Sequence, residues 1–298
     1  MEMVAPGYYR AFSCTADRCT HSCCIGWEID VDEETLALYD ALAGERGERI
    51  RGSILRSDDG ACFALCQDGR CPHLEDTGLC RIICELGEDY LCDICREHPR
   101  FYNVVGERLE CGLGAVCEEA ARLILSWQDY ATLVRVGSFE NGQDTPCTFD
   151  AAARRAQLYT LLSDQTLSYG ERLARIRANF AAPLTASRNK YQGMLCSLEY
   201  MSPSSRELFL DTWKRGACEG QAATLCERFL AYAVYRHASA ASDVQAFGEG
   251  VRAALYMEQI FCALLCRHGY DAVRAAQLVS EELEYSEENT ATLRGAGE

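Results

Sequence analysis

Apolar residues recur at steps of three or four along the second half of the chain, the spacing of an α-helix that buries one face. Within residues 221–237 the recurring positions are Leu225, Phe229, Leu230 and Val234. We therefore expect this half to fold as a helical bundle. The segments with the helical pattern are 115–127, 151–162, 173–182, 208–214, 221–237, 243–268 and 272–283.

Capping residues support the start of several of these helices. An Asp side chain can accept hydrogen bonds from the free backbone N–H groups of a first helical turn, and a Ser followed by a Glu three residues later can do so as a capping box. The polar tail from Ser286 has no such pattern, and we expect it to fray. The capping residues are Asp150 for 151–162, Ser168 with Glu171 for 173–182, and Ser204 with Glu207 for 208–214.

The first third of the chain has a different pattern. One helix is expected over 33–42, with Asp32 as its N-cap. Turn signals containing Asp and Gly then follow at close spacing, at 58–60, 67–69 and 76–78. This region reads as short hairpins and loops around a ligand cluster.

These patterns predict a mainly α fold with two domains. The first is a Cys-rich metal-binding domain over 1–130, built of short hairpins and loops. The second is a helical bundle over 147–298, and a linker is expected at 141–146, which contains Gly142 and Pro146.

Cysteine usage is the strongest chemical signal in the chain. Thirteen of the 19 cysteines lie between Cys14 and Cys117. A chain of this length can bury a core without cross-links, and the first residues show no secretory signal. We therefore expect a cytoplasmic protein, where Cys clusters more often hold metal than form disulfides or redox pairs.

Charge and hydropathy narrow the classes of partner. The net charge of −16 argues against binding nucleic acid or an anionic membrane through a basic face. No stretch approaches the 18 apolar residues of a membrane span. An acidic surface would suit a basic partner such as a lysine-bearing substrate, although acidity also serves solubility.

Thiolates are soft ligands for zinc, copper(I) and iron–sulfur clusters. Cys92 and Cys95 are separated by two residues, which lets both sulfurs point at one ion. The side chains of the adjacent Cys23 and Cys24 diverge, so we expect the two to serve different sites, or one to bind metal while the other packs. The candidate metal ligands are Cys14, Cys19, Cys23, Cys24, Cys71, Cys80, Cys92, Cys95 and Cys117.

Cysteines of the second half have a plainer interpretation. Cys262 and Cys266 lie at i and i+4 of an apolar helix, a spacing that can chelate, but buried cysteines also pack as small hydrophobes, and we expect packing here. Four further cysteines are isolated in sequence and are expected to be structural. They are Cys147, Cys196, Cys218 and Cys226.

Several motifs of residues 5–130 together resemble the flagellin lysine-N-methylase family (FliB), and this N-terminal part is similar to the Cys-rich, zinc- or iron-chelating YkgJ-like group. The resemblance implies methyl transfer from S-adenosylmethionine to lysine side chains of flagellin, in a protein with a [4Fe–4S] cluster. The motifs are Phe12-x-Cys14-x4-Cys19-x3-Cys23-Cys24-x-Gly26-Trp27, Arg70-Cys71-Pro72, Leu79-Cys80, Glu97-His98-Pro99-Arg100 and Gly112-x-Gly114-x2-Cys117-Glu118-Glu119.

The motifs do not identify the cofactor site. A radical enzyme using S-adenosylmethionine would show Cys-x3-Cys-x2-Cys, whereas Cys24 follows Cys23 directly. Gly112 and Gly114 imitate the glycine turn of a cofactor-binding sheet, with Glu110 as its acid, but no alternation of strands and helices follows. The alternative is a tight turn entering the helix at 115–127.

Lysine methylation needs a neutral amine, so a nearby base should accept a proton. The candidates are Glu97, His98, Glu110 and Glu118. We expect an iron–sulfur cluster, with zinc as the alternative metal. The rival to an enzyme is a non-enzymatic module whose metal only holds the loops together.

Overall fold

The computed structural model describes residues 1–58, 60–139, 149–184 and 187–296. The expected linker at 141–146 and Cys147 lie outside the described residues. The chain forms two compact units, which we describe separately. The Cys-rich unit is Ser13–Arg100, and the helical unit combines Met1–Phe12 with Phe101–Glu298.

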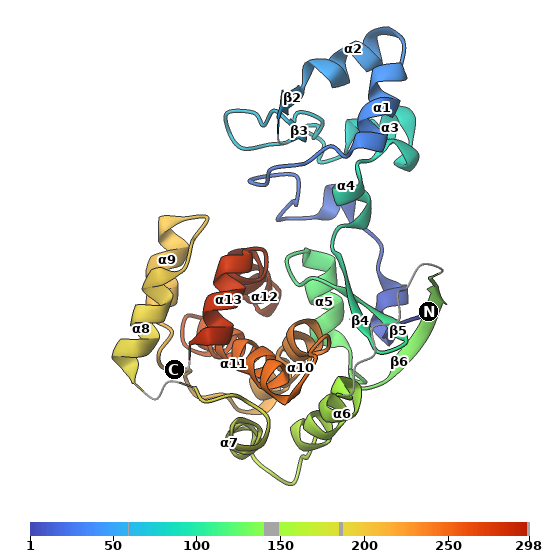
Figure 1. Ribbon diagram of the computed structural model, residues 1–298. Helices are drawn as coiled ribbons and strands as arrows, with labels where there is room; N and C mark the ends of the chain where they lie inside the picture. Colours follow the sequence, from blue (N-terminus) through green and yellow to red (C-terminus); the bar gives the residue numbers. More distant parts are fainter. Residues whose placement is uncertain (59, 140–148, 185–186, 297–298) are drawn as a thin grey trace. The chain divides into compact units, whose positions relative to one another are not determined.

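The Cys-rich unit consists of short helices and one hairpin around a small core (Figure 1). Tyr39, Ile50 and Phe63 are among the few large buried side chains of that core. Such a core stabilises a domain weakly, since little apolar surface leaves water. The elements are α1 (Glu33–Ala41), α2 (Gly44–Gly52), β2 (Ile54–Ser57), β3 (Gly60–Phe63), α3 (Arg81–Leu86) and α4 (Asp93–Glu97).

Helix α1 and the hairpin follow local sequence signals as expected, whereas α2, α3 and α4 were not predicted. Asp32 is the N-cap of α1, and its carboxylate accepts a hydrogen bond from the Thr35 N–H at 2.8 Å. The same carboxylate accepts from the Asp93 N–H at 2.9 Å, so one side chain joins the starts of α1 and α4. The expected hairpin is confirmed by the antiparallel pairing of β2 with β3.

The helical unit contains a four-stranded sheet that sequence analysis did not predict. Its strand order is β4-β5-β1-β6, in which β1 is parallel to β5 and antiparallel to β6. Residues 1–12 and 101–130, which we expected in the Cys-rich domain, therefore group with the helices. The strands are β1 (Glu2–Pro6), β4 (Arg100–Val105), β5 (Arg108–Leu113) and β6 (Leu133–Ser138).

Two long helices, α10 and α11, form the centre of the helical unit (Figure 1). They pack against each other, α5 and α6 pack on α10, and α12 and α13 pack on α11. No helix among the described residues is both long and apolar enough to cross a bilayer. The helices are α5 (Glu118–Ser126), α6 (Ala151–Leu162), α7 (Tyr169–Asn179), α8 (Arg188–Ser197), α9 (Pro203–Leu210), α10 (Gly220–Ala238), α11 (Val244–Cys266), α12 (Ala272–Val279) and α13 (Glu287–Gly295), with a π-helical turn at Ser280–Glu284.

Most of the expected helices are confirmed. The capping box of Ser168 and Glu171 is present at the start of α7, although this helix begins at Tyr169 and ends at Asn179. Asp150 caps α6 by accepting from the Ala153 N–H at 2.8 Å. The prediction of a helix that begins at residue 208 is wrong. Helix α9 begins at Pro203, because Ser202 rather than Ser204 is its N-cap.

The C-terminal tail and one polar helix also differ from expectation. Residues from Glu287 do not fray but form α13, because Leu293 is fully buried and Asn289 donates to the carbonyl oxygens of Glu199 and Glu282. Helix α8 was missed because its polar composition gives only a weak helical pattern.

The contact between α10 and α11 leads to a stability prediction. A Cβ atom built on Gly250 would overlap the carbonyl oxygen of His237 and lie 2.8 Å from the Cα of Ala238. Gly250→Ala should therefore lower the free energy of unfolding by about 1–3 kcal/mol, a common cost of overpacking. Urea denaturation of both proteins measures the difference.

The matched control is Gly193→Ala in α8, where nothing lies within 4 Å of the added Cβ. This change should be neutral or stabilising by up to about 1 kcal/mol, because alanine favours a helix over glycine. Equal effects of the two substitutions would contradict the close approach of α10 and α11.

Candidate functional site

Five of the predicted ligands lie together in the Cys-rich unit and form what we call the five-thiol cluster. Cys71 and Cys92 are buried in the small core, and the other three pack against it. The Cys71 N–H donates to the Cys24 carbonyl at 2.8 Å, which joins two distant loops. The members are Cys24, Cys71, Cys80, which precedes α3, Cys92, which precedes α4, and Cys95 within α4.

The thiols of this cluster influence one another's ionisation. Burial, together with negative charge on Cys24, Cys80 and Cys92, raises the pKa of Cys71 to about 11. A hydrogen bond between Cys92 and Cys95 raises the pKa of Cys95 and lowers the pKa of Cys92. A buried group of thiols that cannot all ionise alone is suited to a cation that replaces their protons.

The remaining predicted ligands lie outside this group, and their roles stay predictions. Cys23 is exposed but hydrogen-bonded to Cys24, an interaction that lowers the pKa of Cys24 to about 7. Cys14 is exposed, and the Cys19 thiol donates to the His21 carbonyl at 3.3 Å. Cys117 belongs to the helical unit, where it immediately precedes α5.

The candidate bases have contrasting surroundings. Glu110 is fully buried, and its carboxylate forms ion pairs with Arg155 at 2.6 Å and Arg108 at 3.1 Å. Glu118 is buried at the start of α5 and pairs with Arg122 at 3.0 Å. Both carboxylates are therefore engaged by guanidinium groups.

The other two candidates lie in the Cys-rich unit. Glu97 is exposed at the end of α4. His98 follows it and is partly buried. Neither position contradicts a role as the base. The assignments of Glu97 and His98 therefore stay predictions.

The glycine candidates lie where a strand gives way to a helix. Gly112 is in β5, and a side chain there would overlap the Phe101 ring. The expected tight turn entering the helix is present: the Cys117 N–H donates to the Gly114 carbonyl at 3.3 Å just before α5. Close packing against Phe101 is enough to require a glycine at position 112, whether or not a cofactor binds there. Cofactor contacts at Gly112 and Gly114 stay predictions.

Four cysteines of the helical unit lie close together, which corrects the expectation that Cys218 and Cys226 are isolated. All four Sγ atoms lie within 4.8 Å of one another, and this arrangement could bind a metal. Cys262 is buried, as expected, but its Sγ atom also lies close to three other cysteine sulfurs. Cys218 lies in the loop before α10, Cys226 lies in α10, and Cys262 and Cys266 lie in α11; we call them the four-cysteine group.

The spacing of these cysteines along the chain does not predict the group, for a physical reason. Only the spacing of Cys262 and Cys266 has a chelating pattern, and that pattern is common on buried helix faces. Cys226 reaches them because α10 packs on α11, and Cys218 reaches them because the loop before α10 lies against the end of α11.

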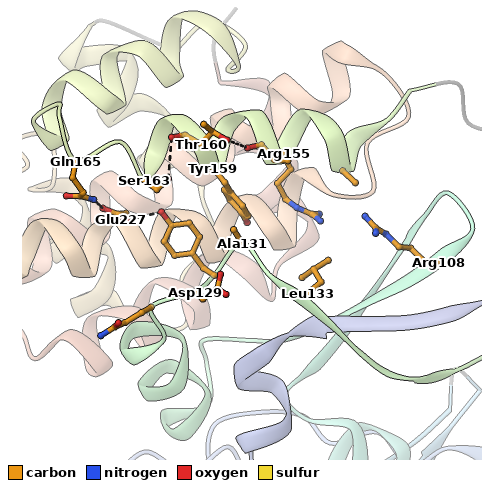
Figure 2. A pocket seen from close by; sticks show the side chains of 14 residues that line it. Arg108, Asp129, Ala131, Leu133, Arg155, Tyr159, Thr160, Ser163, Gln165 and Glu227 are labelled. Carbon is orange, nitrogen blue, oxygen red and sulfur yellow. Dashed lines mark hydrogen bonds between the residues drawn. The ribbon is translucent and has the colours of Figure 1, made fainter.

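A cavity of about 810 Å3 opens in the helical unit between α6, α10 and the segment before β6 (Figure 2). The Glu227 carboxylate lies at one end and accepts hydrogen bonds from Tyr130 at 2.9 Å and Gln165 at 3.2 Å. Arg108 and Arg155 lie toward the other end (Figure 2). This volume and mixed lining suit a ligand of cofactor size.

A smaller cavity of about 380 Å3 is bordered by the buried Glu284 carboxylate. His237 Nε2 lies 2.9 Å from this carboxylate, and the Tyr232 hydroxyl donates to it at 2.6 Å. Burial alone would raise the pKa of Glu284, but the charge of Arg236 and the hydrogen bond with His237 lower it to about 2.

The chain is similar to curated proteins with methylase names, which confirms the resemblance to flagellin lysine-N-methylases. It is 26% identical over 162 residues to a protein named Lysine-N-methylase from Salmonella typhimurium, and equally identical to one from Salmonella choleraesuis. These alignments cover 52% of this chain and 40% of each relative, so the chain spans about two fifths of those relatives' length.

A third relative covers a different share. The Flagellar biosynthetic protein FliU of Salmonella muenchen is 28% identical over 140 residues, which are 45% of this chain and 83% of that protein. No family model matches the chain, and no solved structure is significantly similar to it.

The lowered pKa of Glu284 predicts a dependence of stability on pH. Its folded pKa of about 2 lies below the ordinary 4.5. The ionised carboxylate therefore stabilises the fold fully above pH 4.5 by about 3 kcal/mol, and this contribution is lost as the pH falls toward 2. Urea denaturation of the wild type and of Glu284→Gln should give a stability difference that shrinks over this interval.

The control is Glu288→Gln, at an exposed position in the first turn of α13. Its stability should follow the wild-type pH dependence within a few tenths of a kcal/mol. If Glu284→Gln retains the full acid-induced loss of stability, another group is responsible for it.

Proposed function

We propose that this chain is a protein-lysine N-methyltransferase that uses S-adenosylmethionine and acts on flagellin. The observation that carries the proposal is the similarity to two proteins named Lysine-N-methylase, supported by a relative named for flagellar biosynthesis. The acidic chain, with a net charge of −16, suits a lysine-bearing protein substrate.

The five-thiol cluster is the part of the molecule we propose to hold a [4Fe–4S] cluster. Four sulfurs around one zinc ion lie about 3.8 Å apart, given Zn–S bonds of about 2.3 Å. Among the described residues, no three thiols of the five-thiol cluster lie within 4.8 Å of one another. A spacing wider than that around one zinc ion suits a group of several iron and sulfide ions.

Four of the five thiols would supply the ligands, and the fifth would remain close by. When bound, such a cluster supplies one-electron chemistry at a potential that burial and nearby hydrogen bonds adjust. The Tyr39 hydroxyl donates a hydrogen bond to the Tyr90 carbonyl at 2.6 Å. This bond holds the Tyr39 ring in place beside Cys92.

The large cavity is where we propose that S-adenosylmethionine binds. Its volume of about 810 Å3 accommodates a ligand of that size. The rings of Tyr130 and Tyr159 border the cavity and pack edge to face, with their centroids 5.3 Å apart. Aromatic faces and carboxylates attract a sulfonium cation, and Arg108 can meet a carboxylate.

Methyl transfer requires a lysine amine without its extra proton. The nitrogen lone pair forms the new N–C bond while the C–S bond of the donor breaks, leaving a neutral thioether, and the charged amine then loses a proton. At the cavity, Glu227 is engaged by Tyr130 and Gln165. The exposed Asp129 carboxylate is the acceptor we propose for this proton.

A second candidate function is a non-enzymatic metal-binding module. It is favoured by the position of Cys71 and Cys92 in the small core of the Cys-rich unit. A metal in that place would stabilise the fold outright. The two functions differ in whether the metallated protein transfers methyl groups.

The first prediction concerns metal and activity together. Anaerobically purified wild type should contain iron and sulfide and transfer labelled methyl groups from S-adenosylmethionine to flagellin lysines. Cys95→Ser should lose most of its iron and its methyl transfer, because Cys95 lies within the five-thiol cluster. Iron analysis and scintillation counting measure the two losses.

Cys66→Ser is the matched control, since Cys66 is exposed in the same unit and outside the cluster. It should keep both iron and activity. A fully metallated wild type that labels no flagellin would favour the non-enzymatic module, and full iron in Cys95→Ser would refute the ligand assignment.

The second prediction concerns the cavity. Ala156 is exposed on α6 and borders the cavity, so Ala156→Trp should fill part of it. We expect the dissociation constant for S-adenosylmethionine to rise about tenfold or more, since the indole removes contact surface. Isothermal titration calorimetry measures this change.

Ala153→Trp is the control, because Ala153 is exposed on the same helix but away from the cavity lining. Its affinity should equal that of the wild type. Unchanged affinity in Ala156→Trp would place the cofactor elsewhere, with Gly112 and Gly114 as the next positions to test.

A further inference from the structure

The sulfur positions of the four-cysteine group match a single tetrahedral ion. The Sγ atoms of Cys218 and Cys226 lie 3.4 Å apart, and those of Cys262 and Cys266 lie 4.0 Å apart. Four thiolates bound to zinc are separated by about 3.8 Å, since each Zn–S bond is about 2.3 Å. The two measured distances lie on either side of this value.

This spacing is unsuited to an iron–sulfur cluster. The iron and sulfide ions of such a cluster stand between the ligand sulfurs and hold them further apart. All four Sγ atoms here lie within 4.8 Å of one another. Four soft ligands at a close, closed site suit zinc in a structural role.

The group also joins a loop to two core helices. Cys226 and Cys262 are fully buried in α10 and α11, whereas Cys218 lies in the loop after α9. The Cys262 thiol donates to the carbonyl of Arg215, at 3.5 Å, in the same loop. Gly216 has a φ of +82°, and a Cβ there would lie 3.2 Å from the Cβ of Cys266, so the loop turns tightly over the end of α11.

This loop carries Arg215, whose side chain forms an ion pair in the core. The ion pair requires the loop to stay in place. The Arg215 guanidinium pairs in a bidentate manner with the Glu258 carboxylate, which is fully buried in α11. The Tyr169 hydroxyl donates to the same carboxylate at 2.8 Å. If the loop opened, Glu258 would lose the cation that makes its burial tolerable.

We propose that Cys218, Cys226, Cys262 and Cys266 bind one zinc ion, which anchors the loop before α10 and so keeps Arg215 on Glu258. The site is separate from the five-thiol cluster and does not depend on methyl transfer. Zinc binding replaces the thiol protons and ties three segments of the chain at one point.

Metal analysis of the full chain tests the proposal. Wild type expressed with zinc available should contain about one zinc ion per chain at this site. Cys218→Ser and Cys266→Ser should each lose most of that zinc. Both positions are only partly buried, so the substitutions disturb the core little.

Two control variants separate this site from other thiols. Cys196→Ser, at an exposed position on α8, and Cys95→Ser, in the five-thiol cluster, should both keep the zinc of the helical unit. X-ray absorption of the zinc in Cys95→Ser should show four sulfur neighbours at about 2.3 Å. Mass spectrometry checks for a disulfide between Cys218 and Cys226.

Proteolysis of the loop reports its release without relying on metal content. Lys214 is exposed, so trypsin can cleave after it when the loop opens. Chelation of zinc, or Cys266→Ser, should speed this cleavage about tenfold, and added zinc should reverse the effect of chelation but not of the substitution.

Four results would overturn the proposal. These are a wild type without zinc at this site, zinc retained in both Cys218→Ser and Cys266→Ser, a disulfide between Cys218 and Cys226, and a single iron ion bound by the four thiols in cells supplied with both metals.

Discussion

Four of the buried glutamates in the described part of the helical unit each pair with an arginine from another element, and the unit depends on these pairs. Glu110 pairs with Arg155, Glu227 with Arg172, Glu258 with Arg215 and Glu284 with Arg236. Removing one partner from such a pair commonly costs about 3–5 kcal/mol, because a charge stays buried without compensation. The pairs join different elements in every case, so they fix how the helices, the sheet and the loops meet. The large cavity borders two of these pairs, and the four-cysteine group lies beside a third.

The Cys-rich unit is stabilised differently. Its core holds few large apolar side chains, and the five-thiol cluster occupies part of the space that aliphatic residues fill elsewhere. Thiols pack well as small hydrophobes, yet a cluster of them contributes less apolar area than leucine or phenylalanine would. Metal binding would supply the missing free energy, since binding at such a site is also folding energy. Loss of metal should therefore unfold this unit more readily than the helical unit.

Sequence patterns predicted what local interactions decide. Helices α1, α6, α10 and α11 follow from apolar periodicity and from caps such as Asp32 and Asp150, and the five-thiol cluster contains only predicted ligands. The sheet was missed because β1 pairs with strands more than 100 residues away. Cys218 was missed because its partners come from packing of distant helices. The tail was misjudged because two buried residues, Leu293 and Asn289, hold a polar helix in place.

Spacing along the chain and spacing in space carry different information about a metal. Two residues separate Cys92 from Cys95, and three separate Cys262 from Cys266, yet either spacing serves zinc or iron. The sulfur–sulfur distances indicate which metal fits. The four-cysteine group is as compact as a single ion requires, whereas no three thiols of the five-thiol cluster, among the described residues, are equally close. The charge of the four-cysteine group also matters, because four thiolates around one zinc ion would leave two negative charges. Arg215, whose carbonyl contacts Cys262 and whose side chain neutralises Glu258, lies where that negative charge would accumulate.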